Sequence, residues 1–499
     1  MFELRPYQKE AIAAINEHWE DWQKELLVLP TGCGKTVVFN EIARQNAPGV
    51  LILAHRDELI EQAREKYNGL TGKIKADENL ILPVTVGSVQ TMCRRQYDPD
   101  LFKMIIVDEA HHALSPSYQN ILNQFPDAKV LGVTATADRG DKKNLGQYFE
   151  GIAYDYKLKD AVKDGWLCNL SARTIPIDID LSDVKVTVGD FEVNSIAEAL
   201  GPYLPEIAKS IAEYAADRKT VVFLPLVSIA QEFRDILQSV GLDAREVNGA
   251  STDRKETLEW FDKAGPGSVL CNAMLLTEGW DCPSVDCIVV LRPTKIRSLY
   301  TQMIGRGTRL YPGKKDLLIL DFLWLCQKHN LCKPAHLITD QEEDRKTVSK
   351  RSESEEIDLF DALTDAEEQR RNRLAEELRK QKRKKSKLIN PLELFDLLDD
   401  IGLADYEPSF KWEEVDASEK QVKALEKFGI DAEGISKGYA CRIMDTVIGR
   451  SEKGLATMKQ VRLLHRFGYN NAANMTFDEA TKKITRLAAV GWQRWKLHD

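Results

Sequence analysis

Residues 30–36 have the sequence Pro-Thr-Gly-Cys-Gly-Lys-Thr, which is suited to binding phosphate groups. Gly32 and Gly34 permit a tight backbone, so that successive N–H groups at the start of a helix can converge on phosphate oxygens. Lys35 is expected to reach the β- and γ-phosphates, and the Thr36 hydroxyl to ligate Mg²⁺. We therefore expect ATP to be held by the loop residues Thr31, Gly32, Cys33, Gly34, Lys35 and Thr36.

Two carboxylates follow the apolar run at residues 104–107, which has the composition of a buried strand. A carboxylate pair at a strand tip is the arrangement with which a P-loop ATPase holds its metal and aims a water molecule. We predict that Asp108 holds Mg²⁺, directly or through water, and that Glu109 orients and deprotonates the attacking water. His111 completes the sequence Asp-Glu-Ala-His.

A third group of residues lies farther along the chain, where Gln302, Gly305, Arg306 and Arg309 have helix spacing. Because Arg306 and Arg309 are three residues apart, we expect both to lie on one face of a helix. Guanidinium groups stabilise the charge that spreads over a transferring phosphoryl group. We therefore predict that Gln302, Arg306 and Arg309 complete the catalytic site from a second domain.

Apolar runs that alternate with helix-like segments are expected to position these residues. The runs are residues 26–29, 50–53, 104–107 and 130–133 in the first part of the chain, and 220–224, 268–271, 287–291 and 317–320 in the second. This alternation predicts parallel sheets covered on both faces. We expect an α/β protein with two tandem domains, residues 1–155 and 156–338.

The composition, with 43% hydrophobic and 29% charged residues, is that of a globular protein. No apolar run approaches the roughly 20 residues of a membrane span, and the N-terminal residues do not resemble a signal peptide. The nine cysteines include no Cys-x-x-Cys pair, so we expect no structural zinc and reduced thiols in a cytoplasmic protein. The net charge of −9 describes the whole molecule and does not exclude a basic groove.

The three motifs, in this order, resemble those of superfamily 2 DEAD/DEAH-box helicases, in particular RadD-like helicases and the Res subunits of type III restriction enzymes. The resemblance covers roughly residues 1–330. It is carried by residues 4–8, 30–36, 54–59, 87–91, 108–111, 276–281, 292–295, 300–310 and 321–322. It implies two RecA-like P-loop domains, ATP hydrolysis with Mg²⁺, and translocation or unwinding on DNA in recombination or repair.

The resemblance also implies roles for residues outside these three motifs. Arg5 and Gln8 would lie on the adenine side, while Gly279 and Asp281 would contact the nucleotide from the second domain. Thr277 would contact a phosphate of the nucleic acid. The remaining implied nucleic-acid contacts are Arg56, Ser88, Thr91 and Asn248, which would position a strand without recognising its sequence. For Ser88 and Asn248, an ordinary loop or cap role is an alternative.

Residues 339–395 are rich in Glu, Lys and Arg. Residues 365–387 can form one long helix with opposite charges three or four positions apart, which predicts a charged helical linker. A disordered tether is the alternative.

Residues 396–499 contain an internal repeat, in which residues 417–429 recur as residues 456–468. Ser418 and Thr457 each begin a capping box, and Gly429 and Gly468 fit the ends of the helices that follow. We therefore predict a small all-α domain in which two helix hairpins share one core. The basic side of each first helix has two interpretations, a contact with a phosphate backbone or a solvated face.

The main hypothesis is an ATP-dependent DNA helicase or translocase that acts on single-stranded, forked or branched DNA in recombination, repair or replication. An RNA helicase is an alternative, because the DEAH sequence does not by itself distinguish DNA from RNA. A third hypothesis is a nucleic-acid-binding scaffold, in which ATP acts as a switch and the C-terminal repeats recruit replication or recombination proteins.

Overall fold

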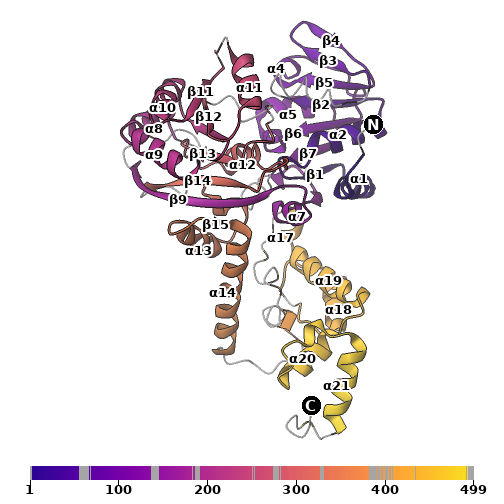
Figure 1. The fold of residues 1–499 in the computed structure, drawn as a ribbon. Coiled ribbons are helices and arrows are strands. Elements are labelled where there is room, and N and C mark those ends of the chain that lie inside the picture. Colours follow the sequence, from indigo (N-terminus) through magenta and orange to yellow (C-terminus); the bar gives the residue numbers. More distant parts are fainter. Residues whose placement is uncertain are drawn as a thin grey trace. The chain divides into compact units, whose positions relative to one another are not determined.

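The computed structural model describes residues 3–54, 69–135, 145–181, 191–249, 253–273, 282–325, 331–380, 410–432 and 434–489, with isolated positions between these ranges. It divides into two compact units, residues 1–366 and 367–499. The first unit contains two β-sheets covered by helices, and the described elements of the second unit are helices (Figure 1).

The first sheet positions two segments, residues 30–36, called the phosphate loop below, and Asp108 with Glu109, called the acid pair. Its strands, in spatial order, are β4 (Glu78–Leu80), β3 (Gly72–Lys75), β5 (Val84–Ser88), β2 (Val50–Ala54), β6 (Met104–Asp108), β7 (Lys129–Thr134), β1 (Lys24–Val28) and β8 (Gly151–Asp155). All neighbours are parallel except β3 and β4. Because parallel strands end on the same edge of a sheet, the segments that follow β1, β6 and β7 meet there.

Helices α1 (Pro6–His18) and α2 (Lys35–Asn46) cover one face of this sheet. Their buried side chains, which include Ile15 and Phe39, pack against Leu27 and Ile106 of the strands. This packing follows from the apolar stripe of each helix and the alternation of side chains along each strand. The other helices of this part of the chain are α4 (Val89–Met92), the 3₁₀ helix η1 (Ala110–Leu114), α5 (Pro116–Leu122) and α7 (Leu158–Lys163).

The second sheet has seven strands. In spatial order they are β11 (Asp243–Val247), β12 (Ser268–Ala273), β10 (Thr220–Leu224), β13 (Cys287–Val290), β14 (Asp316–Leu325), β9 (Asn169–Asp180) and β15 (Ile357–Asp358). All neighbours are parallel except β9 and β15. The eight strands that the sequence predicts are all present in the two sheets, which are predominantly parallel as expected.

Helices cover both faces of the second sheet (Figure 1). Neighbouring side chains of β10 point to opposite faces, so Val222 and Val221 belong to different cores. The core around Val222 includes α8 (Val193–Leu200), α9 (Leu204–Tyr214) and α10 (Val227–Ser239). The core around Val221 includes α11 (Arg254–Lys263), α12 (Arg297–Gly305) and α13 (Glu342–Ser352). Two 3₁₀ helices, η2 (Gly201–Tyr203) and η3 (Pro334–Leu337), complete this part.

The predicted start of the linker at residue 339 differs from the structure. Helix α13 and strand β15 pack on the second sheet and belong to the first unit, which extends to residue 366. Val348, Ile357 and Leu359 are buried there. These apolar residues are sparse in a strongly charged stretch, so the composition of the stretch concealed their burial.

The second unit contains two helix hairpins on one core. Helix α14 (Leu359–Lys380) begins in the first unit and ends in the second. The helices that follow are α17 (Lys411–Glu414), α18 (Glu419–Phe428), α19 (Lys437–Glu452), α20 (Met458–Arg466), the 3₁₀ helix η4 (Ala472–Asn474) and α21 (Phe477–Ala489). Ser418 and Thr457 cap α18 and α20, and Gly429 ends α18 with a φ of 85°. The buried side chains of both hairpins form a single cluster, as predicted.

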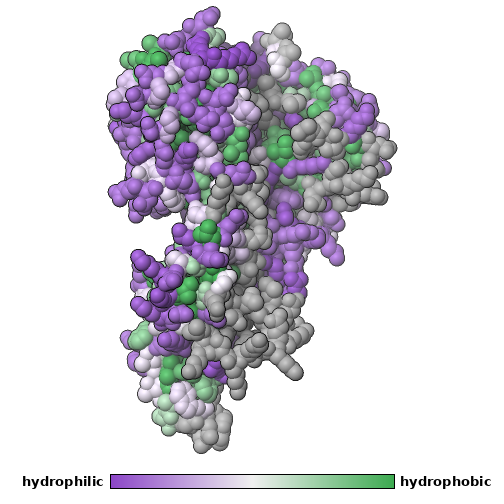
Figure 2. Space-filling model, turned by 180° about the vertical axis from the view of Figure 1, so that it is seen from behind, coloured by the Kyte–Doolittle hydropathy of each residue, from purple (hydrophilic) through white to green (hydrophobic). Residues whose placement is uncertain are grey.

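None of the described helices combines the length and the apolar composition that crossing a bilayer requires. On the face of the molecule shown in Figure 2, hydrophobic residues form small separate patches among hydrophilic ones. Within the described residues, no three His, Cys, Asp or Glu side chains gather in a way that could hold a metal ion.

Candidate functional site

The phosphate loop has the tight conformation that the sequence predicts. Gly32 and Gly34 have φ angles of 93° and 76°, in the left-handed region that favours glycine. A Cβ atom on Gly34 would lie 2.7 Å from the side-chain nitrogen of Gln8. Gly34 is also the N-cap of α2 and provides no side-chain cap. The first N–H groups of α2, which begins with Lys35 and Thr36, are therefore placed to bind an anion.

Helix α1 holds this loop through the carbonyl oxygen of Cys33. The Tyr7 hydroxyl donates to that oxygen at 2.8 Å, and the Gln8 side-chain nitrogen donates to it at 3.0 Å. In a trans peptide the carbonyl and the next N–H point in opposite directions, so the N–H of Gly34 is directed away from α1. Burial raises the pKa of Tyr7 to about 12, so its hydroxyl remains a donor at neutral pH.

The structure gives Gln8 and Arg5 a role in supporting the loop. The side-chain oxygen of Gln8 accepts from the backbone N–H of Arg5 at 3.0 Å, and its nitrogen bonds to Cys33. The Arg5 guanidinium donates to the Tyr7 hydroxyl at 3.1 Å and lies over the Trp166 ring, 4.9 Å from the centroid. Recognition of adenine by Gln8 and Arg5 stays a prediction. Sequence analysis missed Tyr7, although it lies directly before Gln8.

The acid pair lies at the same sheet edge as the phosphate loop. Asp108 pairs with Val133, one residue before the end of β7, and β7 pairs with β1, the strand that leads into the loop. A carboxylate oxygen of Asp108 accepts from the N–H of Glu109 at 3.0 Å. His111 Nδ1 lies 3.8 Å from a carboxylate oxygen of Glu109.

The backbone of Glu109 is strained. Its φ and ψ are 52° and 66°, a left-handed conformation in a residue that is not glycine. Such a conformation costs of order 1–3 kcal/mol and persists where the surrounding structure enforces it, often at functional sites. Glu109 directly follows β6 and is the N-cap of η1. Its left-handed backbone sets the direction of its side chain at the sheet edge.

The two predicted arginines do not share a helix face, contrary to the prediction. Helix α12 ends at Gly305, with Arg306 as its C-cap, so Arg309 lies in an irregular segment beyond the helix. Arg306 donates to the main-chain oxygen of Trp280 at 2.7 Å. Arg309 is half-buried, and burial lowers its pKa. The helix ends where the chain meets the phosphate loop, a long-range contact that residue spacing does not reveal. Residues 305–309 are called the arginine segment below.

The arginine segment packs directly on the phosphate loop. A Cβ atom on Gly305 would lie 2.5 Å from the Cβ atom of Thr31. The Thr308 hydroxyl donates to the carbonyl oxygen of Thr31 at 3.3 Å. A Cβ atom on Gly32 would lie 3.5 Å from Cγ of Arg309. The structure therefore places Arg309 beside the loop that the sequence assigns to ATP.

Lys314 fastens the arginine segment to a neighbouring loop. Its ammonium nitrogen donates to the carbonyl oxygen of Arg309 at 3.0 Å and to that of Gly307. It also bonds to the carbonyl oxygens of Val285 and, at 3.4 Å, Pro283. Burial lowers the pKa of Lys314. Sequence analysis missed this residue because a lysine between a glycine and a second lysine is typical of an exposed turn.

Four of the predicted site residues, Arg56, Thr277, Gly279 and Asp281, lie outside the described residues. Gln302 is on α12 and is 8% exposed.

Two predicted nucleic-acid contacts have partners within the chain. The Ser88 hydroxyl donates to the side-chain oxygen of Gln90 at 2.9 Å. The Thr91 hydroxyl accepts from the backbone N–H of Ala76 at 3.0 Å. Both hydroxyls therefore stabilise the chain locally, and their contact with nucleic acid stays a prediction.

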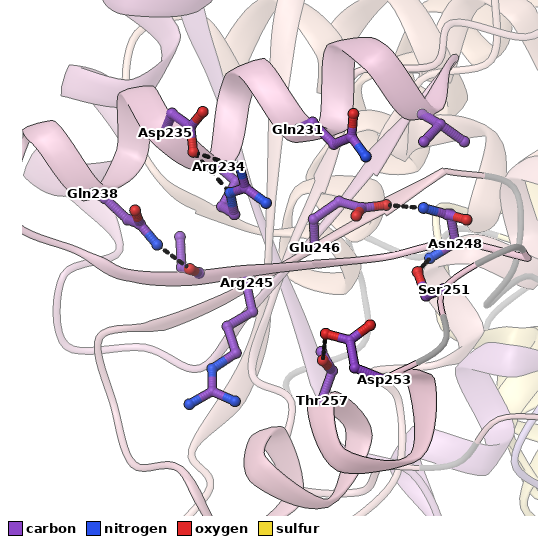
Figure 3. Close-up of a pocket in the computed structure, with 12 residues that line it drawn as sticks. Gln231, Arg234, Asp235, Gln238, Arg245, Glu246, Asn248, Ser251, Asp253 and Thr257 are labelled. Carbon is purple, nitrogen blue, oxygen red and sulfur yellow. Dashed lines mark hydrogen bonds and ion pairs between the residues drawn. The ribbon is translucent and has the colours of Figure 1, made fainter.

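Asn248 lines a pocket formed by α10, β11 and the start of α11 (Figure 3). Its backbone N–H donates to the Ser251 hydroxyl at 3.0 Å, and its side-chain nitrogen donates to Glu246 at 2.8 Å. The volume of the pocket is about 710 Å³ and its lining is mostly polar, whereas small-molecule pockets are mostly apolar. No residue of the phosphate loop, acid pair or arginine segment lines it, so it is separate from the candidate nucleotide site.

Comparison with known proteins identifies two regions that match protein families. Residues 1–139 match the family described as "Type III restriction enzyme, res subunit". Residues 203–311 match the "Helicase conserved C-terminal domain". The first region contains the phosphate loop and the acid pair, and the second contains the arginine segment.

Two relatives show the extent of the similarity. The chain is 33% identical to a Saccharomyces cerevisiae protein named "Putative ATP-dependent helicase IRC3" over 64% of this chain and 51% of that protein. It is also 33% identical to the "DNA 3'-5' translocase XPB2" of Sulfurisphaera tokodaii over 63% of this chain and 79% of that protein. The chain thus spans about half the length of the yeast relative and most of the archaeal one.

The fold resembles a solved structure described as an ATP-dependent Type ISP restriction-modification enzyme, LlaBIII, bound to DNA. The TM-score is 0.54 at 13% identity, over 98% of this chain and 42% of that chain. At this identity the likeness concerns the fold alone, which is two RecA-like domains built on predominantly parallel sheets. Together, the two matched regions, the archaeal relative and the fold show that the chain belongs to the superfamily 2 helicases.

Proposed function

We propose that this protein hydrolyses ATP between its two RecA-like domains and uses the cycle to translocate on, unwind or remodel DNA. The observation that carries the proposal is the contact of the arginine segment with the phosphate loop. Gly305 and Thr308 touch Thr31, and Arg309 lies beside Gly32. A triphosphate on this loop would therefore have a guanidinium from the second domain next to it.

The residues at the loop fit ATP and Mg²⁺. The side-chain hydroxyl of Thr31 is buried without a hydrogen-bond partner, and the N-terminus of α2 has no side-chain cap. Orphan donors of this kind at a helix N-terminus are typical of phosphate sites. Lys35 would bind the β- and γ-phosphates, while Thr36 and Asp108 would hold Mg²⁺. The metal would neutralise part of the phosphate charge.

The chain's own residues then divide the work of hydrolysis. Glu109 takes the proton of the attacking water, held in position by its enforced backbone and by Asp108. His111 lies close enough to influence the Glu109 carboxylate. Arg309 stabilises the charge on the transferring phosphoryl group. Arg306, bonded to Trp280, links the arginine segment to the adjacent motif at residues 276–281.

DNA is the proposed substrate because the archaeal relative is named as a DNA translocase. On this proposal Ser88, Thr91 and Asn248, together with Arg56 and Thr277, contact the sugar–phosphate backbone of a bound strand. Gly279 and Asp281 contact the nucleotide from the second domain, and Gln302 supports the catalytic arginines. We place the activity in the cytoplasm, in recombination, repair or replication.

The decisive test is an ATPase assay with single-stranded, duplex, forked and four-way DNA, alongside RNA of matched length. We expect DNA to stimulate hydrolysis more than RNA does. Lys35→Ala should abolish hydrolysis and unwinding, and Glu109→Gln should trap a state bound to both ATP and DNA. Greater stimulation by RNA would replace the DNA proposal with an RNA helicase. Unimpaired biological activity of Lys35→Ala would point instead to a scaffold.

A further inference from the structure

The first helices of the two hairpins in the second unit have similar sequences. Residues 417–429 and 456–468 align without a gap, at a constant offset of 39. Many of the preserved positions have a structural reason. The pairs Ser418/Thr457 and Gln421/Gln460 form capping boxes, and Leu425/Leu464 lies in the shared core. Preservation at these positions follows from folding alone.

Three basic positions are preserved as well, and they belong neither to the capping boxes nor to the core cluster. They are Lys420/Lys459, Lys423/Arg462 and Lys427/Arg466. Five of the six side chains are exposed, and Arg462 is half-buried. Both acidic positions of the first repeat are lost in the second, because Glu419 corresponds to Met458 and Glu426 to His465. Helix α18 therefore carries a net charge of +1, whereas α20 carries +3 and no acid.

A solvated face requires polarity but not a particular sign of charge. If solubility were the only constraint, acidic and basic positions would have been exchanged equally between the repeats. Instead, every cation is retained, whereas Glu426 is replaced by His465. The other acid, Glu419, is replaced by Met458, which lies in the core. The selective retention indicates a constraint on positive charge.

The three cations of each helix share one face, and Lys459 of α20 lies beside the end of α18. In each helix they occupy positions i, i+3 and i+7, which lie on one face and span two turns, about 10 Å. The side chain of Lys459 crosses the end of α18, where a Cβ atom on Gly429 would lie 2.9 Å from its Cε atom. Gly429 directly follows the last turn of α18, which contains Lys427. We call these six residues the basic stripe.

We propose that the basic stripe binds the phosphate backbone of nucleic acid, as a contact site additional to the one on the RecA-like domains. Lysine and arginine side chains at regular intervals neutralise phosphates and release counterions, without recognising bases. The site requires neither ATP nor hydrolysis.

The test measures binding of the full-length protein, without nucleotide, to fluorescent single-stranded and duplex DNA of mixed sequence across a salt series. The variant Lys459→Gln/Arg462→Gln/Arg466→Gln should bind both DNAs about tenfold more weakly. Its plot of log affinity against log salt should be less steep by about 2–3 for duplex DNA. The control Lys453→Gln/Lys482→Gln/Arg486→Gln removes the same charge from the same unit outside the stripe, and should retain wild-type binding. Both variants should keep the wild-type melting temperature and nucleic-acid-independent ATPase rate.

A second variant tests the proposal by gain of function. Glu419 pairs with Lys423 at 3.3 Å, so Glu419→Gln/Glu426→Gln releases a cation and raises the charge of α18 to that of α20. This variant should bind DNA more tightly and show a steeper salt dependence. Unchanged DNA binding by the stripe variant would overturn the proposal. Loss of binding to polyglutamate with DNA binding intact would also overturn it, in favour of an acidic protein partner.

Discussion

The proposed ATP cleft has two walls, which are positioned by different means. The first is the phosphate loop with the acid pair, and the second is the arginine segment. On the first wall, backbone conformation does most of the positioning, through the left-handed glycines of the phosphate loop and the carbonyl of Cys33 held by α1. On the second wall, a single side chain, Lys314, bonds to the backbone of the arginine segment and to a neighbouring loop. The first arrangement leaves a local sequence signature and the second does not. The second should therefore be the more dependent on one distant charge.

The largest expected effect distinguishes the two arginines of the second wall. Arg309→Ala should lower kcat by about 10³-fold while ATP still binds, because a guanidinium that stabilises the transition state contributes on this scale. Steady-state ATPase kinetics with saturating DNA measures the change. Arg309→Lys keeps the charge but loses the planar fork, so it should recover only part of the rate. A larger loss in Arg306→Ala, with Arg309→Ala near wild type, would reverse the assignment.

A smaller effect is expected from one methyl group on the first wall. Gly34→Ala places a Cβ atom 2.7 Å from the Gln8 side chain at a φ of 76°. The loop must shift, and we expect ATPase activity to fall about 100-fold with weaker binding of a fluorescent ATP analogue. The matched control is Gly165→Ala, which has a φ of 73° but no atom near the added methyl. Equal losses in both variants would mean that backbone strain, rather than displacement of the loop, is responsible.

Removing the charge of Lys314, which holds the arginine segment in place, should have a moderate effect on the ATPase rate. Lys314→Met leaves the carbonyls of the arginine segment without their shared donor, so Arg309 loses its fixed position. We expect kcat to fall about tenfold, with the KM for ATP changed less than twofold. Lys315→Met, at the exposed neighbouring lysine, is the control. A purely structural role of Lys314 would instead lower the melting temperature of Lys314→Met and reduce its activity in proportion to the fraction folded.

The smallest effect concerns stability. It tests whether Glu25 on β1, the strand that leads into the phosphate loop, makes the free energy of unfolding depend on pH. Glu25 on β1 is fully buried, and burial raises its pKa to about 8. The folded state thus retains a proton that the unfolded state loses above about pH 4.5, so stability falls as the pH rises toward 8. Glu25→Gln should remove this dependence and raise the free energy of unfolding at pH 8 by about 1–3 kcal/mol. Urea unfolding at pH 5 and pH 8 measures it, and an equal pH slope in both proteins would refute the burial argument.

Local signals predicted the parts of the structure that local interactions determine. Short apolar runs gave the eight strands, the capping boxes at Ser418 and Thr457 gave two helix starts, and the glycines gave the loop. Contacts between segments that are distant in the sequence could not be predicted from it. Helix α12 ends where Gly305 meets Thr31, so the assumed helical spacing of the arginines was wrong. Lys314 acts through carbonyl oxygens, which every residue carries and no sequence pattern marks.

The cysteine in the phosphate loop has a consequence for the protein's chemical resilience. Cys33 is fully buried, and burial raises the pKa of its thiol to about 11. Peroxide and alkylating agents attack the thiolate of an accessible cysteine, and at neutral pH Cys33 is neither ionised nor accessible. The proposed nucleotide site therefore contains a sulfur atom that should resist oxidants, and iodoacetamide should leave the ATPase intact under native conditions.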